Sequence, residues 1–123
     1  MVKTLNVDSC PTVVAPDSTL IRELLNPSHT GIEASIRYSL AHGTILKGGR
    51  THKHRLRSTS ETYYILAGKG RISVDEVVVK VRPGSLVYVP PQAMQHVENV
   101  GESDLEYLVI CDPAWSDHDV EVQ

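Results

Sequence analysis

The feature that most constrains this fold is a series of short segments rich in Val, Ile, Thr and Tyr that begins near residue 32. Gly, Pro, Asn and Asp separate each segment from the next, as turn residues do between strands. We predict strands at residues 34–40, 44–46, 62–66, 71–74, 77–81, 86–89 and 105–110. Short, regularly spaced strands without intervening helices indicate an all-β sandwich or barrel, not a parallel α/β sheet.

The N-terminal part has a different pattern. Its first sixteen residues, with Val13 and Val14 between two prolines, are typical of an extended arm or edge strand. Asp17-Ser-Thr then precedes the apolar residues 20–25, and Pro27 follows, which predicts a capped short helix. With 123 residues the chain fits one domain, comprising an arm and helix (residues 1–30), a barrel core (about 32–112) and a tail (113–123).

Charge and composition narrow the class of partner. The chain has 12 Lys and Arg against 15 Asp and Glu, a formal charge of -3, so no basic face for nucleic acid is expected. No stretch approaches the ~20 apolar residues of a membrane span, and no signal peptide opens the sequence. Two distant cysteines without CxxC spacing suggest free thiols. We expect a cytoplasmic protein whose partner is a small molecule, with neither nucleic acid nor membrane.

Histidines and one glutamate are the candidate metal ligands. His52 and His54 are two residues apart and would share one side of a strand, and Glu61 follows on the next predicted strand. Two imidazoles and a carboxylate form the facial set used by Fe(II) and related ions. The alternative is that residues 52–57 form a solvated polar rim, and the H-x-H pair by itself favours that alternative.

The surrounding spacing adds a family resemblance. Glycines at 48 and 68 frame one motif, and a second runs from Gly84 to Asn99. Within them, ETYYILAGKG (61–70), GSLVYVPP (84–91) and the later DPAW (112–115) are the most specific phrases. Residues 32–115 thereby resemble the cupin family, in particular small single-domain cupins described as mannose-6-phosphate-isomerase-like. The resemblance implies a double-stranded β-helix, a jelly-roll-like barrel.

The first motif can be counted in two ways. Five residues separate Gly48 from His54, which makes His54 and Leu56 the family's H-x-H positions and keeps Glu61 in register. The other count takes His52 and His54 as the pair and places two extra residues in the turn before Glu61. Both counts retain His54 and Glu61.

The second motif places Gln95, not His96, at the family's third histidine position. Neighbouring residues of a strand face opposite sides, so we prefer Gln95 inward and His96 outward, although a β-bulge would exchange them. The candidate metal ligands are His52, His54, Glu61 and Gln95, holding Zn, Mn, Ni or Fe. The alternative is a metal-free pocket in which these groups bind each other or a ligand.

The expected function is that of a small metal-dependent enzyme. A Lewis-acid ion would activate a small polar carbonyl compound for isomerase, cyclase or lyase chemistry, with Glu61 as the catalytic residue that moves a proton. Dioxygenase chemistry would need His52 or His96 inward. The alternative is a non-catalytic module that binds a sugar or metabolite at a degraded metal site. We also expect a homodimer in which the arm around Val13 and Val14 covers a partner's sheet edge.

Overall fold

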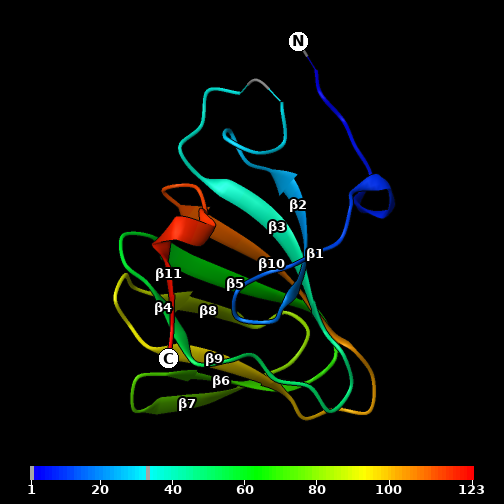
Figure 1. Ribbon diagram of the computed structural model, residues 1–123. Helices are drawn as coiled ribbons and strands as arrows, with labels where there is room; N and C mark the ends of the chain where they lie inside the picture. Colours follow the sequence, from blue (N-terminus) through cyan, green and yellow to red (C-terminus); the bar gives the residue numbers. More distant parts are fainter. Residues whose placement is uncertain (1, 33) are drawn as a thin grey trace.

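The computed structural model describes residues 2–32 and 34–123, and within them the chain is all-β (Figure 1). Two short 3-10 turns, Val7–Ser9 and Asp117–Asp119, are its only helical elements there. The strands are β1 (Val13–Val14), β2 (Leu20–Leu25), β3 (Ser39–Ile45), β4 (His54–Leu56), β5 (Ser60–Ala67), β6 (Gly70–Val74), β7 (Val77–Val81), β8 (Leu86–Val89), β9 (Gln95–Asn99), β10 (Leu105–Asp112) and β11 (Val120–Val122).

The strands form two antiparallel sheets that enclose the core. One sheet has the order β1-β2-β3-β10-β5-β8 and the other the order β11-β4-β9-β6-β7. Side chains alternate between the interior and solvent, as in β5, where Tyr63 and Ile65 are buried and Tyr64 is exposed. Ile72 of β6 and Val97 of β9 meet them from the second sheet and are fully buried. The all-β, jelly-roll-like prediction is confirmed.

The predicted helix at residues 20–25 is wrong, because these residues form strand β2. A helix of six residues has few internal hydrogen bonds to offset its nucleation cost. As a strand the same residues pair with β1 on one side and β3 on the other, and every side chain becomes partly buried. The capping signal at Asp17 serves a turn instead, since its carboxylate accepts from the Thr19 backbone N–H while Ser18 has a φ of 81°.

Several strand predictions match closely and others shift. The structure has Val77–Val81 and Leu86–Val89 as predicted, whereas the strand expected at 34–40 begins at Ser39. Residues of the predicted tail contribute β11, which pairs with β4 and extends the second sheet. No helix in residues 2–32 and 34–123 is long and apolar enough to cross a membrane.

Register places the candidate site residues on facing strands. His54 of β4 lies opposite Gln95 of β9 in one sheet. Glu61 of β5 lies opposite Cys111 of β10 in the other sheet. Each points inward, and the space between the sheets near these four residues is where the site forms.

Candidate functional site

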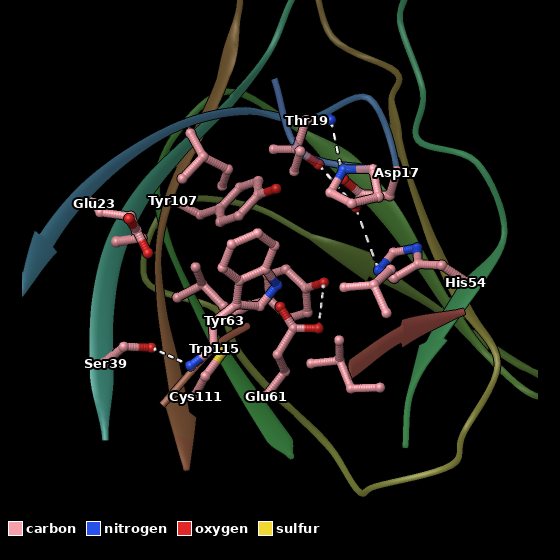
Figure 2. Close-up of a pocket in the computed structure, with 17 residues that line it drawn as sticks. Asp17, Thr19, Glu23, Ser39, His54, Glu61, Tyr63, Tyr107, Cys111 and Trp115 are labelled. Atoms are coloured by element: carbon pink, nitrogen blue, oxygen red, sulfur yellow. Dashed lines mark hydrogen bonds and ion pairs between the residues drawn. The ribbon is translucent and has the colours of Figure 1, made fainter. Parts of the chain in front are cut away.

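A largely enclosed pocket lies between the two sheets (Figure 2). The cavity measures about 40 Å³. It is large enough for about two or three water molecules as the side chains stand, so a larger ligand enters only when lining side chains move. The lining residues are Ala15, Pro16, Asp17, Thr19, Ile21, Glu23, Ser39, Ala41, His54, Leu56, Glu61, Tyr63, Tyr107, Val109, Cys111, Trp115 and Val120.

Glu61 is a carboxyl group of the pocket whose pKa is raised into the neutral range. Gln95 Nε2 donates to Glu61 Oε1 at 2.7 Å, and the Tyr63 hydroxyl donates to Gln95 Oε1 at 2.6 Å. The pKa of Glu61 is raised to about 7, mainly by burial; His54 and the hydrogen bonds from Gln95 and Tyr63 lower it, and the charge of Asp17 raises it. A carboxyl group with this pKa can both accept and donate a proton near neutral pH.

His54 and Asp17 form a second polar unit in the pocket. His54 Nδ1 lies 2.8 Å from the His52 carbonyl oxygen and must donate to it, since a carbonyl only accepts. Nε2 lies 3.3 Å from Asp17 Oδ2, within ion-pair distance when the ring is protonated. Asp17 is fixed in turn by the Thr19 hydroxyl at 2.9 Å and the Thr19 backbone N–H at 3.1 Å. The imidazole and the carboxylate therefore face each other inside the pocket.

The structure brings His54, Glu61 and Gln95 together and leaves His52 outside. β4 begins only at His54, so the alternation that would turn His52 inward does not extend to it, and its side chain is exposed. The two inward positions of β4 are His54 and Leu56, which agrees with the count from Gly48. Gln95 is 1% exposed, whereas His96 faces the other way and contacts Glu98.

The donor groups in this arrangement do not fit the divalent metal expected from the sequence. His54 Nε2 faces Asp17 Oδ2 at 3.3 Å, and Gln95 Oε1 accepts from the Tyr63 hydroxyl. Leu56 occupies the second ligand position, and His52 lies outside. Among residues 2–32 and 34–123, no three or more His, Cys, Asp or Glu side chains are grouped as a metal site requires.

Sequence reasoning did not identify the pocket groups contributed by β2 and the C-terminal region. Thr19, Ile21 and Glu23 line the pocket at every second residue, a period-2 pattern that the helix prediction concealed. Asp17 had been assigned only a capping role. Trp115 belongs to the DPAW phrase quoted for the family resemblance, but nothing in that phrase indicated where its indole would lie.

Comparison with known proteins agrees with this architecture. The family model for the cupin domain matches residues 41–111, more than half of the chain. This chain belongs to the cupin family. An uncharacterised protein of Methanocaldococcus jannaschii is 32% identical over 94% of this chain and 90% of its own length. An uncharacterised protein of Streptomyces coelicolor is 31% identical over 58% of this chain and 67% of its own.

Solved structures share the fold at low sequence identity. A predicted oxalate decarboxylase of Thermotoga maritima has a TM-score of 0.78 at 18% identity, covering 90% of this chain and 99% of its own. Pac13, described as a unique nucleoside dehydratase, has a TM-score of 0.77 at 16% identity, covering 100% and 92%. A Streptomyces Pac13 variant was solved with uridine, again with a TM-score of 0.77, at 18% identity and 100% and 92% coverage. At these identities the likeness establishes the fold alone.

Proposed function

We propose that this protein is a small lyase or isomerase that transfers a proton on a polar carbonyl- or hydroxyl-bearing metabolite. The observation that carries the proposal is the placement of the Glu61 carboxyl group inside the pocket that also contains the His54–Asp17 unit. A general base and a proton donor in one enclosed site are the minimum for such chemistry. The raised pKa of Glu61, about 7, supports the assignment because proton transfer is most efficient near the ambient pH.

In this mechanism Glu61 in its ionised form removes a proton from the carbon next to a carbonyl. The C–H electron pair forms a carbon–carbon double bond, and the carbonyl electron pair moves to oxygen as an enolate. His54 Nε2, 3.3 Å from Asp17, is the group that stabilises that oxygen when the ring is protonated there. Return of the proton to another carbon completes an isomerisation, and departure of a protonated hydroxyl as water completes a dehydration.

The solved neighbours support the reaction class at the level of the fold. Dehydration, the reaction of Pac13, and decarboxylation, predicted for the Thermotoga maritima protein, are both lyase reactions. The same barrel supports many activities, so the activity of this protein is determined by the residues of its pocket. Here the polar groups favour acid–base chemistry on a small carbonyl- or hydroxyl-bearing substrate.

The test measures deuterium incorporation from D2O into a panel of small ketoses and hydroxycarbonyl compounds, with uridine included, by NMR. We expect exchange or elimination by the wild type and a loss of about 100-fold or more in Glu61→Gln. Glu98→Gln is the matched control, because Glu98 is a carboxylate outside the pocket. Unchanged activity in Glu61→Gln would overturn the proposal. Activity that is lost on chelation and restored by a divalent metal would return the function to the metal-dependent class.

One observation favours a second candidate, a non-catalytic binding module. Leu56 and Gln95 occupy positions where the family pattern has histidine, and both are buried in well-packed surroundings. A module of this kind would bind its ligand equally well in the wild type and in Glu61→Gln, and neither protein would turn it over. Measuring binding beside turnover separates the two candidates.

A further inference from the structure

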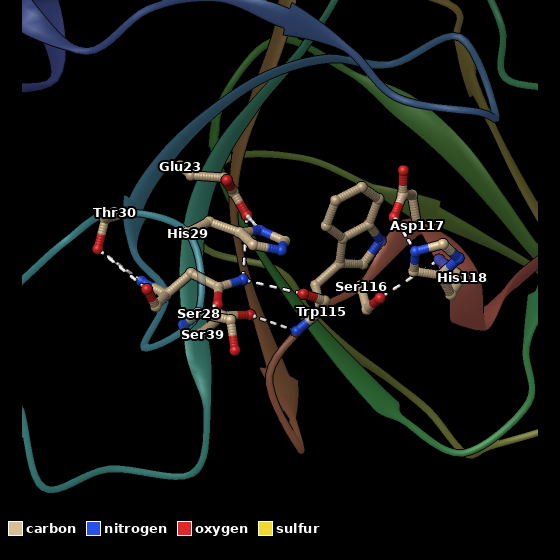
Figure 3. Close-up of polar contacts among 10 residues, drawn as sticks. Glu23, Ser28, His29, Thr30, Ser39, Trp115, Ser116, Asp117 and His118 are labelled. Carbon is tan, nitrogen blue, oxygen red and sulfur yellow. Dashed lines mark hydrogen bonds and ion pairs between the residues drawn. The ribbon is translucent and has the colours of Figure 1, made fainter.

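A second polar cluster, distinct from Glu61 and its partners, borders the pocket on the side of β2 (Figure 3). It consists of Glu23, Asn26, His29 and Trp115. Glu23 and Trp115 line the pocket, while Asn26 and His29 stand behind them. The proton-transfer mechanism uses none of these residues.

Glu23 is held by two donors that leave part of its carboxylate free. Its Oε1 accepts from His29 Nδ1 at 2.9 Å and from Asn26 Nδ2 at 3.0 Å. Asn26 is fully buried, so this support is rigid. No hydrogen bond from the described part of the chain reaches Glu23 Oε2. A carboxylate fixed by one oxygen can offer the other to a hydroxyl group of a ligand.

Trp115 is fixed through both of its backbone polar groups. Its N–H donates to Ser39 Oγ at 2.9 Å, and its carbonyl accepts from Asn26 Nδ2 at 2.9 Å. The His29 ring packs edge-on against the indole, with centroids 6.2 Å apart and an interplanar angle of 83°. Figure 2 shows the indole among the pocket residues, near Tyr107 and Glu61. An aromatic face held in this way can pack against the apolar face of a ring.

The charges around the pocket disfavour an anionic ligand. Its lining contains the carboxyl groups of Asp17, Glu23 and Glu61 and the imidazole of His54, and no Lys or Arg among residues 2–32 and 34–123 lines it. Proteins bind carboxylates and phosphates with Arg, Lys or helix N-termini. His54 already faces the carboxylate of Asp17 at 3.3 Å. A phosphate or carboxylate entering the pocket would therefore meet uncompensated negative charge at short range.

Resting on the function proposed for this pocket, we propose that Glu23 and Trp115 select an uncharged ring compound that carries a hydroxyl group and exclude its anionic analogues. One ligand hydroxyl donates to Glu23 Oε2, and the ring lies against the indole of Trp115. A free sugar or the sugar part of a nucleoside would satisfy the same contacts. Sugar phosphates, the class suggested by the isomerase-like resemblance, would not.

The chain has one tryptophan, so its fluorescence reports directly on ligands in this part of the pocket. The panel consists of matched pairs, ribose with ribose 5-phosphate and adenosine with AMP, titrated into the wild-type protein. We expect the neutral member of a pair to bind about tenfold or more tightly than its anionic partner. The pair that shows binding distinguishes the free sugar from the nucleoside. Equal or tighter binding of the anionic members, or no binding by either neutral member, would overturn the proposal.

Two variants test the separate roles of the residues. Glu23→Gln should reduce the preference for the neutral member several-fold, because it removes a negative charge while retaining the hydrogen-bonding shape. Trp115→Phe, followed by calorimetry because the fluorophore is lost, should weaken the neutral ligands less than Trp115→Ala does. Glu106→Gln on the outer side of β10 is the matched control. A preference that is identical in Glu23→Gln and the wild type contradicts the role of Glu23.

The outcomes also separate this proposal from the catalytic one. Selective binding of neutral ligands without turnover would support the recognition proposal and contradict the catalytic one. Turnover that depends on Glu61 but accepts anionic substrates equally well would contradict the recognition proposal and support the catalytic one.

Discussion

Glu61 is a carboxyl group in a buried position, where its charged form is destabilised by the loss of hydration. Its pKa is about 7 in the folded chain, against an ordinary value of 4.5, with burial as the main cause. Between these two pH values the folded protein binds more protons than the unfolded chain, so the free energy of unfolding must fall as the pH rises. The groups that face Glu61 are His54, Asp17, Tyr63, Tyr107 and Cys111.

The first prediction concerns this pH dependence. From about pH 4.5 to pH 7 the wild type should lose on the order of 3 kcal/mol relative to Glu61→Gln, which has no titrating group at this position. Urea unfolding of both proteins at pH 5 and pH 8 measures the difference, with Glu76→Gln at an exposed position as the control. Parallel pH profiles for the wild type and Glu61→Gln would contradict the buried, ionisable state of this residue.

For single residues, the sequence predicted the inward-facing side chains best where the motif spacing and the alternation along a strand agree. His54, Glu61 and Gln95 are each at a motif position, and each is buried in the structure. His52 was grouped with them by the period of two, which holds only within a strand, and β4 begins after it. Asp17 was out of reach of such reasoning, because its contact with His54 joins residues 37 positions apart without any repeating pattern.

Among the elements, β2 shows why the pocket was only partly predictable. Leu20–Leu25 has a helical spacing of leucines, and six residues are too few for the local pattern to distinguish helix from strand. Pairing with β1 and β3 decides the outcome, and pairing partners distant in sequence are invisible to local propensity. The helix prediction therefore also missed Glu23 as a pocket residue, because Glu23 faces the pocket from strand β2.

The second prediction belongs to the contact between β3 and β10. Gly43 lies opposite Tyr107, and a Cβ atom added at Gly43 would lie 2.5 Å from Tyr107 Cε1. The Tyr107 ring cannot easily yield, because it is buried and packs against Tyr63 with centroids 5.1 Å apart. Gly43→Ala should therefore destabilise the protein by about 1–3 kcal/mol through overpacking.

Thermal or urea unfolding measures this effect, with Thr44→Ala on the other side of the same strand as the control. Because Tyr107 also lines the pocket, Gly43→Ala should weaken ligand binding as well. A variant as stable as the wild type would show that β3 and β10 adjust without cost, contrary to the close packing described here.

In the whole molecule, the outer face of the six-stranded sheet carries an apolar patch, defined as Tyr64, Leu66, Leu86, Tyr88 and Ile110. Tyr64 lies opposite Leu86, while Tyr88 and Ile110 both lie opposite Thr62, so cross-strand pairing brings these side chains onto one surface. Leu86 is 64% exposed and Tyr88 58%. The patch amounts to on the order of 500 Å² of apolar surface, near the upper end of what a monomer leaves uncovered.

A second copy of this chain is the occupant that best fits the apolar patch. Two such patches facing each other across a two-fold axis, with the polar rim around them, approach the ~1,200 Å² at which stable interfaces begin. The structure also offers the surface expected from the sequence, since Val13 and Val14 are exposed on β1 at the far edge of the same sheet. A dimer formed through each surface would be disrupted by different substitutions, and the apolar patch is the larger of the two surfaces.

The third prediction is that the protein is a two-fold homodimer at micromolar concentration and that the apolar patch holds it together. Leu86→Lys should shift the mass measured by light scattering or sedimentation from dimer to monomer, because it places a charge in a desolvated contact. Val77→Lys is the matched control, since Val77 is 61% exposed on the opposite sheet and should leave the mass unchanged. If Val14→Lys dissociates the dimer and Leu86→Lys does not, the interface lies at the N-terminal arm instead. A monomer in the wild type would contradict both, and the apolar patch would then be a surface that this small barrel leaves exposed to water.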